Sequence, residues 1–339
     1  LQQSSAASDV YKRQPQGNGT LVNADRGLEE AYCAAITKSL TQQNPKTRIA
    51  YTPLHGVAMG LIQKSFTKAQ AGELIPVKTQ MVPDADFPTV SFPNPEEHGV
   101  MDSVTDLAKA SNADLALAND PDGDRLAVAI PTLSGDWRLL SGDEIGALLF
   151  NHVARKTSGN NRKVVTTIVC SKLVSKIASN HGVEHATTLT GFKWIIPAAY
   201  NDSSLQPIFC YEEALGYATN TAVRDKDGIS AALMMAELTA ALKEQGQTLE
   251  DELDALSLEY GHHVTKTWRV RFNSDKSSNV IPKVMQHLRA NPLSTVNQMK
   301  VLEVKDYLFQ DNEIGLPNTD LIVIKIENNV RISIRPSGT

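Results

Sequence analysis

The sequence predicts an α/β protein with two tandem domains, each a mixed sheet flanked by helices, followed by an α+β domain at its carboxyl end. Short apolar stretches of strand length alternate with amphipathic stretches of helix length, and this alternation occurs twice along the chain. From residue 262 onward the pattern changes to alternating polar and apolar positions with one helical stretch. The length of 339 residues also exceeds what a single hydrophobic core usually supports.

Changes in composition divide the chain into five segments. Residues 1–14 are polar and lack the apolar core of a signal peptide, so we expect a disordered or foreign leader there. A short segment at 15–46 leads into the first α/β domain, which is predicted at 47–158. A polar, Gly-containing stretch separates this domain from the second α/β domain at 159–260. The α+β domain occupies residues 261–339.

The first α/β domain is predicted from strands that each lead into a helix. Ligands bind at the carboxyl ends of the strands in such parallel sheets, and His55 lies in the turn after the first strand. The Pro-rich stretch 82–96 is expected to form an ordered or semi-rigid loop. The strands are expected at 48–52, 74–79, 113–118 and 126–130, and the helices at 28–40, 59–68, 104–110 and 143–155.

The second α/β domain repeats this pattern, and the third domain departs from it. The last five residues combine Arg335 with two hydroxyl side chains and a Gly, which is the composition of an anion-binding turn. In the second domain, strands are expected at 164–170, 185–189 and 207–211, with helices at 173–179 and 229–244. In the third, we expect a strand at 265–272, a helix at 280–289 and a hairpin at 321–334 that turns at Asn328 and Asn329.

An acidic loop follows the third predicted strand. Asp120, Asp122 and Asp124 stand at alternate positions in it. Three carboxylates this close repel one another by roughly 3 kcal/mol per pair at about 5 Å, so a loop that turns them together favours a bound cation. Oxygen ligands favour Mg²⁺, which keeps coordination positions free for a phosphate oxygen. The neighbouring Arg125 could hold the same phosphate with its planar, permanently charged guanidinium group.

Other interpretations of the acidic loop stay open at this point. An Asp-rich loop can be an ordinary solvated turn, and an Asp-x-Asp pair after a strand also occurs in phosphatases. An EF-hand fits the first three ligand positions. It fails at the sixth position, where Arg125 replaces Gly, and at the twelfth, where Pro131 replaces a bidentate Glu.

Composition argues against several functional classes. The net charge of −5 and the absence of a Lys/Arg cluster in the sequence argue against a nucleic-acid partner. No segment approaches the roughly 20 apolar residues that a membrane span requires. The three cysteines, Cys33, Cys170 and Cys210, lack the spacing of metal or redox motifs, which favours buried thiols in a reducing, cytoplasmic compartment.

Several motifs occur in an order that resembles the α-D-phosphohexomutase superfamily. Within it, the chain is most similar to the branch of phosphoglucomutase 2-like enzymes and phosphopentomutases, over nearly everything after residue 25. Ala214 stands where many relatives carry Ser, which removes one hydroxyl contact to sugar and favours this branch. The motifs are the acidic loop 119–125, the stretches 51–56, 87–90, 189–194, 212–216 and 225–228, and the terminal Arg-x-Ser-Gly-Thr of 335–339.

The resemblance implies a role for each domain and for single residues. Segment 15–46 would be the remnant of a phosphoserine domain, 47–158 would bind metal, 159–260 would bind sugar, and 261–339 would be a truncated phosphate-binding domain. The metal would be Mg²⁺, held by Asp120, Asp122 and Asp124, and the catalytic residues would be Arg125 and Lys226. The substrate would be bound by Thr190, Gly191, Glu212, Arg335, Ser337, Gly338 and Thr339. Lys193, Glu213 and His55 are further candidates.

The implied activity is that of a phosphoglucomutase-type isomerase in carbohydrate metabolism. A phosphoserine would phosphorylate a sugar 1-phosphate or 6-phosphate, and the bisphosphate would reorient and return its other phosphate. The implied substrates are glucose 1-phosphate and glucose 6-phosphate, with ribose phosphates as a second candidate. The family's serine loop does not occur in this sequence, so the chain alone is expected to be inactive. Alternatives are a phosphomannomutase or glucosamine-phosphate mutase, a hexose-1,6-bisphosphate synthase, and a non-catalytic sugar-phosphate sensor.

Overall fold

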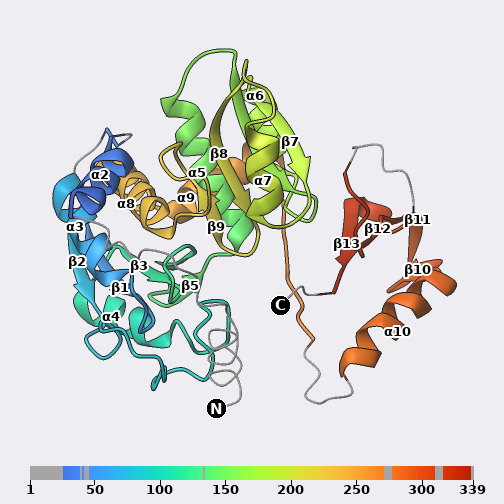
Figure 1. Cartoon of the computed structure of the whole chain (residues 1–339), viewed down its shortest axis with the longest axis horizontal. Coiled ribbons are helices and arrows are strands. Elements are labelled where there is room, and N and C mark those ends of the chain that lie inside the picture. Colours follow the sequence, from blue (N-terminus) through green and yellow to red (C-terminus); the bar gives the residue numbers. More distant parts are fainter. Residues whose placement is uncertain are drawn as a thin grey trace, which may run out of the picture.

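The computed structural model shows two α/β domains beside a smaller domain built on an antiparallel sheet (Figure 1). This arrangement confirms the predicted fold class. In the described part of the chain, no helix is long and apolar enough to cross a membrane. The predicted leader at 1–14 lies outside the described residues, which are 26–38, 40–41, 46–132, 134–270, 277–309 and 316–336.

The first sheet is mixed and follows the predicted alternation of strands and helices. Its strands, in the spatial order β2-β1-β3-β4-β5, are β1 (Arg48–Thr52), β2 (Glu73–Pro76), β3 (Leu115–Asn119), β4 (Leu126–Pro131) and β5 (Trp137–Leu139). β1 is parallel to β2 and β3, whereas β3, β4 and β5 are antiparallel. Because β1 and β3 are central, nearly all of their residues are buried, which explains their apolar sequences.

Helices from two parts of the chain pack against this sheet. α2 (Arg26–Thr37) packs on α3 (Met59–Ala69), and α4 (Asp102–Ser111) contacts β1 and β3. α8 (Gly228–Glu244) comes from the sequence of the second α/β domain, yet it contacts α3, β3 and β4 (Figure 1). Nearly all residues of α8 are buried, so its almost uniformly apolar sequence reflects burial on every side.

The second sheet is also mixed, in the spatial order β7-β6-β8-β9. β6 is parallel to β7 and β8, and β8 is antiparallel to β9. Its strands are β6 (Arg162–Thr167), β7 (Glu184–Thr188), β8 (Gln206–Glu212) and β9 (Gly216–Ala218). The helices of this part are α5 (Gly142–Lys156), α6 (Leu173–Asn180), α7 (Phe192–Ala199) and α9 (Leu249–Tyr260). α5 lies in the predicted first α/β domain by sequence, but it packs on α6, α8 and β8.

One hydrophobic core runs through both α/β domains. Phe150 of α5 and Leu233 of α8 are fully buried in it. The buried carboxylate of Glu237, also on α8, accepts hydrogen bonds from His152 Nε2 (2.9 Å) and Lys156 Nζ (2.5 Å) of α5. Because the two α/β domains share helices and core, the loops at the ends of their sheets are held in fixed relative positions.

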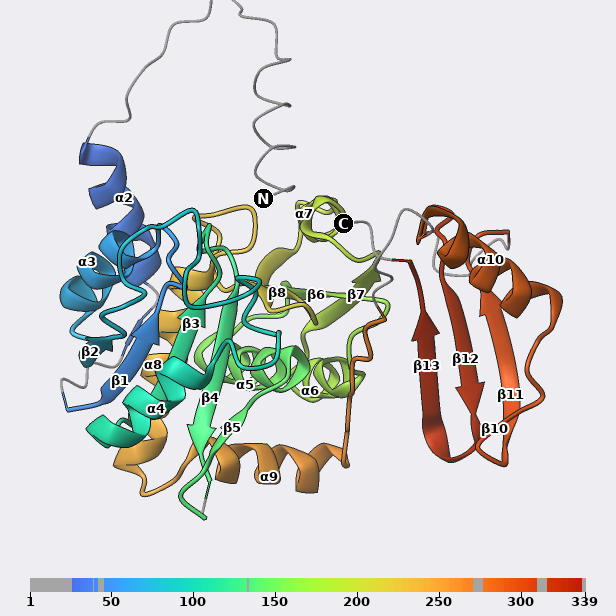
Figure 2. The same ribbon diagram turned by 90° about the horizontal axis from the view of Figure 1, so that it is seen from below.

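The C-terminal domain packs α10 (Ser277–Ala290) against an antiparallel sheet (Figure 2). The sheet has the order β10-β11-β12-β13, with β10 (Thr295–Val296), β11 (Met299–Asp306), β12 (Ile322–Ile326) and β13 (Val330–Ile334). The predicted hairpin is confirmed, because β12 pairs with β13 and the turn residues Asn328 and Asn329 adopt positive φ angles.

The predicted strand at 265–272 is wrong over its described residues, 265–270. They belong to a linker between α9 and α10, and no described strand pairs with them (Figure 2). The apolar side chain of Trp268 is 88% exposed, so the alternating pattern does not mark a buried face. Residues 271 and 272 lie outside the described residues.

Candidate active site

The acidic loop follows β3 and closes on itself. The Gly123 N–H donates a hydrogen bond to the backbone carbonyl of Asp120 (2.9 Å). The side-chain carboxylate of Asp120 accepts two hydrogen bonds from Arg125, one from its backbone N–H (3.0 Å) and one from its Nε (2.6 Å). Asp120, Asp122 and Asp124 each present an oxygen, and these atoms lie within 4.8 Å of one another. The three carboxylates predicted as metal ligands are thus gathered at the carboxyl end of β3.

The turn after β1 supports the acidic loop. The Val57 N–H donates to the carbonyl of Pro121 (2.9 Å), and a Cβ at Gly56 would lie 2.3 Å from the Pro121 Cα. Any side chain at position 56 would therefore displace the loop. His55 is 3% exposed, and its Nε2 lies 2.8 Å from Thr89 Oγ1, so this histidine anchors the Pro-rich loop.

Burial and repulsion shape the charges of the acidic loop. Burial, followed by repulsion from Asp120 and Asp124, raises the pKa of Asp122 to about 6. Burial also raises the pKa of Asp124, although Lys226 and Arg125 act in the opposite direction. The raised pKa values mean that the surroundings do not fully compensate the negative charge of the loop. A divalent cation would supply that charge, and three carboxylate donors fit Mg²⁺.

Lys226 connects the second α/β domain to the acidic loop. Its Nζ lies 2.8 Å from Asp124 Oδ2 and 5.5 Å from the centroid of the Phe192 ring. Gly216 forms a β-bridge with Arg125, and a Cβ at Gly216 would lie 2.6 Å from Lys226 Cδ. Both cations predicted as catalytic therefore lie beside the carboxylates. The sequence did not indicate Phe192 as a site residue, because a buried aromatic at a helix start usually indicates core packing.

Glu212 ends β8 and contacts the turn before α7. Its Oε2 accepts a hydrogen bond from the Gly191 N–H (3.0 Å), and Gly191 has a φ of +109°. The structure thus brings two predicted sugar-binding residues together, with the half-buried Thr190 next to them. Burial, followed by repulsion from Glu213, raises the pKa of Glu212 to about 7. When ionised, Glu212 can only accept hydrogen bonds, which suits the hydroxyl donors of a sugar.

Glu212 is expected to make stability depend on pH. Its folded pKa of about 7 exceeds the ordinary value of 4.5, so the folded chain binds this proton more tightly than the unfolded chain. The free energy of unfolding should therefore fall as pH rises from 4.5 to about 7, and Glu212→Gln should remove this contribution. Thermal unfolding at several pH values tests this. A melting-temperature difference between variant and unchanged chain that is independent of pH would contradict it.

β13 leads Arg335 to the second α/β domain. The Arg335 Nη2 lies 3.8 Å from Glu213 Oε1, and the other oxygen of Glu213 accepts from Thr167 Oγ1 (3.0 Å). Glu213 therefore contacts the C-terminal domain, whereas Lys193 is exposed on α7. The other predicted phosphate-binding residues, Ser337, Gly338 and Thr339, lie outside the described residues.

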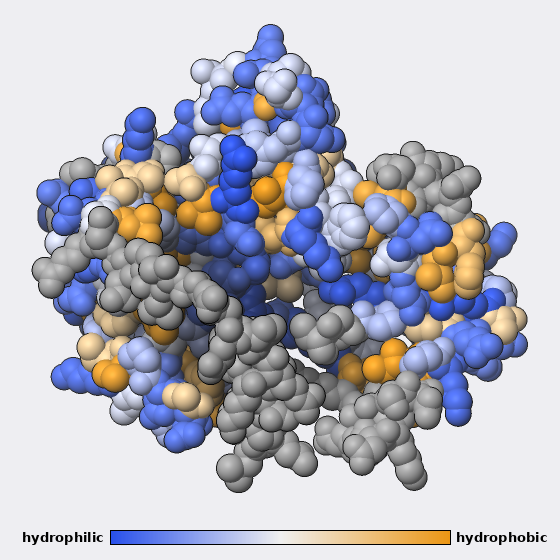
Figure 3. Space-filling view, in the orientation of Figure 1, coloured by the Kyte–Doolittle hydropathy of each residue, from blue (hydrophilic) through white to orange (hydrophobic). Residues whose placement is uncertain are grey.

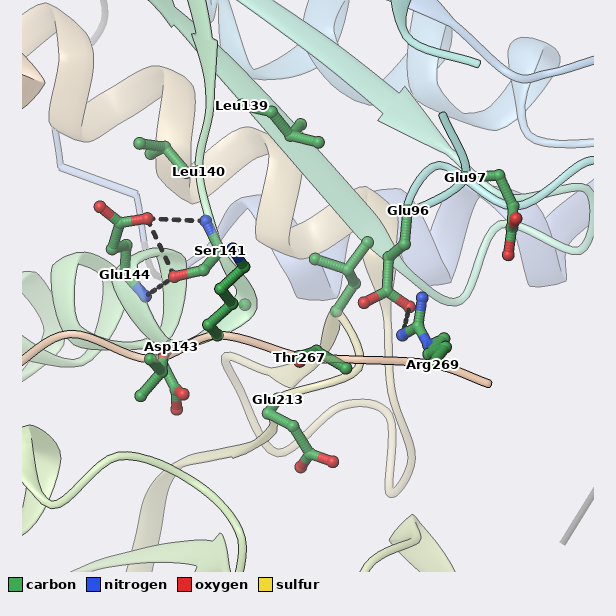
Figure 4. A pocket seen from close by; sticks show the side chains of 14 residues that line it. Glu96, Glu97, Leu139, Leu140, Ser141, Asp143, Glu144, Glu213, Thr267 and Arg269 are labelled. Atoms are coloured by element: carbon green, nitrogen blue, oxygen red, sulfur yellow. Dashed lines mark hydrogen bonds and ion pairs between the residues drawn. The ribbon is translucent and has the colours of Figure 1, made fainter. Parts of the chain in front are cut away.

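A cavity of about 680 Å³ lies beside the turn that follows Glu212, between this turn and the linker after α9. Figure 4 shows that Glu96 in its wall forms an ion pair with Arg269 (2.6 Å) and that Ser141 and Glu144 form the capping box of α5. These carboxylates thus have structural partners. In the orientation of Figure 3, hydrophilic residues gather in the hollow between the α/β domains and the C-terminal domain.

Fold and site together define a multidomain α/β protein with a cluster of three carboxylates at the end of one sheet and a carboxylate-bearing turn in the next domain. Comparison with protein families agrees with this class. The model "Phosphoglucomutase/phosphomannomutase, alpha/beta/alpha domain II" matches residues 30–135, and the corresponding model of domain III matches residues 141–260. The chain belongs to the α-D-phosphohexomutase superfamily.

Several curated proteins are similar in sequence. A Haemophilus influenzae protein named "Probable phosphomannomutase" is 39% identical over 92% of this chain and 62% of its own length. A Staphylococcus aureus phosphoglucomutase is 30% identical over 100% of the chain and 66% of its own length. A phosphopentomutase of Pongo abelii is 34% identical over 87% of the chain and 52% of its own length. The chain thus spans less than two thirds of each of these relatives.

Solved structures share the fold. A phosphoglucomutase/phosphomannomutase family protein from Burkholderia thailandensis has a TM-score of 0.64 and 19% identity over 99% of this chain and 66% of that chain. The N-acetylphosphoglucosamine mutase of Aspergillus fumigatus, in complex with GlcNAc-6P and magnesium, has a TM-score of 0.52 and 15% identity, over 84% of this chain and 64% of that chain.

Proposed function

We propose that this chain carries the metal and sugar sites, and part of the phosphate site, of a Mg²⁺-dependent sugar-phosphate mutase. The observation that carries the proposal is the cluster of Asp120, Asp122 and Asp124, with Lys226 of the second α/β domain paired to Asp124 and Glu212 next to Lys226 around Gly216. Relatives named phosphoglucomutase, phosphomannomutase and phosphopentomutase support this reaction class. The magnesium in the fungal mutase of similar fold supports the choice of cation.

In this proposal the acidic loop binds the reacting phosphoryl group through its cation. Asp120, Asp122 and Asp124 would hold Mg²⁺, which when bound neutralises charge on a transferring phosphoryl group. Arg125 and Lys226 would add two positive charges on the same side, and both side chains are held by carboxylates of the loop. Positioning and charge neutralisation would thus provide most of the catalysis.

The remaining residues would orient the sugar phosphate. Glu212 would accept hydrogen bonds from sugar hydroxyls, with Thr190 and Gly191 lining the same turn. Arg335 would bind the non-reacting phosphate, together with Ser337, Gly338 and Thr339. Binding energy from this remote phosphate would orient the substrate in both of its poses.

The reaction we propose is phosphoryl exchange through a phosphoserine and a sugar bisphosphate. The phosphoserine gives its phosphoryl group to a sugar monophosphate, and the bisphosphate reorients and returns its other phosphoryl group to the serine. We find no serine loop of the family in this sequence, and we therefore expect the chain alone to bind substrate without turnover.

We propose glucose 1-phosphate and glucose 6-phosphate as substrates, with ribose phosphates as the second candidate. Ala214 offers no hydroxyl to sugar in the turn after Glu212, which supports the phosphoglucomutase and phosphopentomutase branch over a mannose-specific enzyme. The 39% identity to the Haemophilus influenzae protein supports phosphomannomutase as an alternative.

The test is Mg²⁺-dependent interconversion of glucose 1-phosphate with glucose 6-phosphate, and of ribose 1-phosphate with ribose 5-phosphate, by the full-length gene product. Mannose phosphates serve as the third substrate pair. Mg²⁺-dependent turnover of either of the first two substrate pairs would support the proposal. Comparison of the two rates would show which sugar is preferred. If none of the three substrate pairs is interconverted, the proposal of a mutase is overturned. Formation of a hexose bisphosphate from an acyl phosphate donor would then indicate a bisphosphate synthase.

A further inference from the structure

The C-terminal domain is attached to the second α/β domain through Arg331 of β13. Its Nη1 donates to the carbonyl of Ile168 (3.0 Å), and its Nη2 donates to the carbonyls of Val169 (3.1 Å) and Cys170 (2.7 Å). These carbonyls belong to one turn, 168–170, which joins β6 to α6. A single guanidinium group of the C-terminal domain thus satisfies three consecutive backbone acceptors of its neighbour.

The chemistry of this contact requires arginine. A guanidinium group carries five N–H donors in a rigid planar fork, whereas a lysine ammonium is a single point of charge on a flexible stem. Apolar residues from both domains lie beside the contact. Ile168 of the turn is buried in one cluster with Tyr307, Leu321 and Val323 of the C-terminal domain. Hydrogen bonds and apolar packing therefore both connect the two domains at this turn.

The contact also has an opposing contribution. Lys172 follows the turn at the start of α6, and its pKa is lowered, first by burial and then by the positive charge of Arg331. Arg331 and Lys325 of the C-terminal domain thus both place positive charge near Lys172 while the domains are docked. This repulsion opposes the docked arrangement.

Arg331 is coupled by position to the predicted phosphate ligand Arg335. Side chains alternate along a strand, so residues four apart in β13 and its extension lie on the same face. Arg335 reaches the same neighbouring domain at Glu213 (3.8 Å), and Glu213 is bonded to Thr167, the residue before the 168–170 turn. The docking point of Arg331 and the predicted sugar-binding turn are therefore parts of one connected structure.

We propose that Arg331 is a positioning residue that docks the C-terminal domain on the 168–170 turn and thereby places Arg335 opposite the turn that carries Glu212. The identity of the ligand, a sugar phosphate, rests on the proposed function, whereas the docking itself does not. When Arg331 is released from the three carbonyls, Arg335 moves away with the rest of β13. The site then binds the sugar of its ligand, but Arg335 no longer contacts the non-reacting phosphate.

Distance measurements between spin labels test the docking in the complete chain. Leu258 on α9 is 88% exposed and Leu302 on β11 is 62% exposed, so cysteine-linked labels at these positions report the distance between the two domains. We expect one narrow distance distribution for the unchanged chain and a broad one for both Arg331→Ala and Arg331→Lys. Lys325→Ala is the matched control, because Lys325 is the cross-strand neighbour of Arg331 and pairs with Glu303 of its own sheet. Its charge repels Lys172 of the neighbouring domain, so its loss should not release the docked domain.

Titration with glucose 1-phosphate in the presence of Mg²⁺ tests the consequence for binding. If opening leaves about a tenth of the molecules docked, the apparent Kd rises about tenfold in Arg331→Ala, and it stays unchanged in Lys325→Ala.

Narrow distance distributions in both Arg331 variants would overturn the docking role, and so would a broad distribution in Lys325→Ala alone. Broad distances with an unchanged Kd would overturn the link to Arg335. If even the unchanged chain binds no sugar phosphate, the proposed function fails, while the distances still decide on docking.

Discussion

Replacing Asp122 with Ala is expected to abolish Mg²⁺ binding at the acidic loop and turnover by the full-length gene product. The substitution leaves Asp120 and Asp124, but Asp120 is already hydrogen-bonded to Arg125 and Asp124 is paired with Lys226. Asp122 is therefore the carboxylate of the loop that is most available to a cation. Loss of a cation that stabilises phosphoryl transfer by several kcal/mol corresponds to about three orders of magnitude or more in kcat.

Calorimetric titration with Mg²⁺ and the interconversion assay measure these effects. Asp106→Ala is the matched control, because it removes the same charge from an exposed position on α4 of the same domain.

The thermal stability of the metal-free protein gives a second, independent measurement. Since burial, followed by repulsion from Asp120 and Asp124, raises the pKa of Asp122 to about 6, Asp122→Ala should unfold at a higher temperature than the unchanged chain above that pH when Mg²⁺ is absent. Normal Mg²⁺ affinity in Asp122→Ala would exclude this loop as the metal site.

The sequence predicted the parts of the site that are local in the chain. The acidic loop could be located because its three carboxylates lie within five consecutive positions after an apolar strand, and the structure has this strand and brings the three carboxylates together. The hairpin near the carboxyl end was found for the same reason, since two Asn residues mark its turn. In both cases neighbouring residues determine the structure without help from distant parts of the chain.

Contacts between domains could not be predicted in this way. Local pattern identified α8 as a helix, but its uniformly apolar sequence does not reveal that it also packs against β3 and β4 of the first sheet. The ion pair of Lys226 with Asp124 depends on that packing, because Lys226 immediately precedes the N-cap of α8. Its assignment as a catalytic residue therefore came from family resemblance, and the geometry came from the structure.

The linker at 265–270 shows the opposite failure. Its alternation of polar and apolar residues satisfied the rule for a strand, yet a strand also requires a partner that supplies backbone hydrogen bonds. The described sheets offer none to this segment. Arg269 instead pairs with Glu96 in the lining of the cavity, a contact between residues so distant in sequence that no local pattern could indicate it.

Gly228→Ala is expected to disable the site from a position that touches neither metal nor sugar. Gly228 is the first residue of α8, and a Cβ there would lie 2.3 Å from the carbonyl oxygen of Arg125 and 2.4 Å from Asn119 Nδ2. These two groups already form a hydrogen bond of 2.6 Å with each other. The added methyl group must therefore push the start of α8 away from the acidic loop, and Lys226 moves with it.

The expected result is a loss of stability together with a larger loss of function. Overpacking of this kind typically lowers the free energy of unfolding by about 1–3 kcal/mol, and a shift of about 1 Å in a positioning element can reduce turnover about a hundredfold.

Gly60→Ala is the matched control, because a Cβ at Gly60 on α3 meets nothing within 4 Å. That variant should be as stable as the unchanged protein or up to about 1 kcal/mol more stable. Thermal unfolding and the interconversion assay on both variants separate the two effects. If Gly228→Ala loses stability yet keeps full turnover, the contact between α8 and the acidic loop serves folding alone.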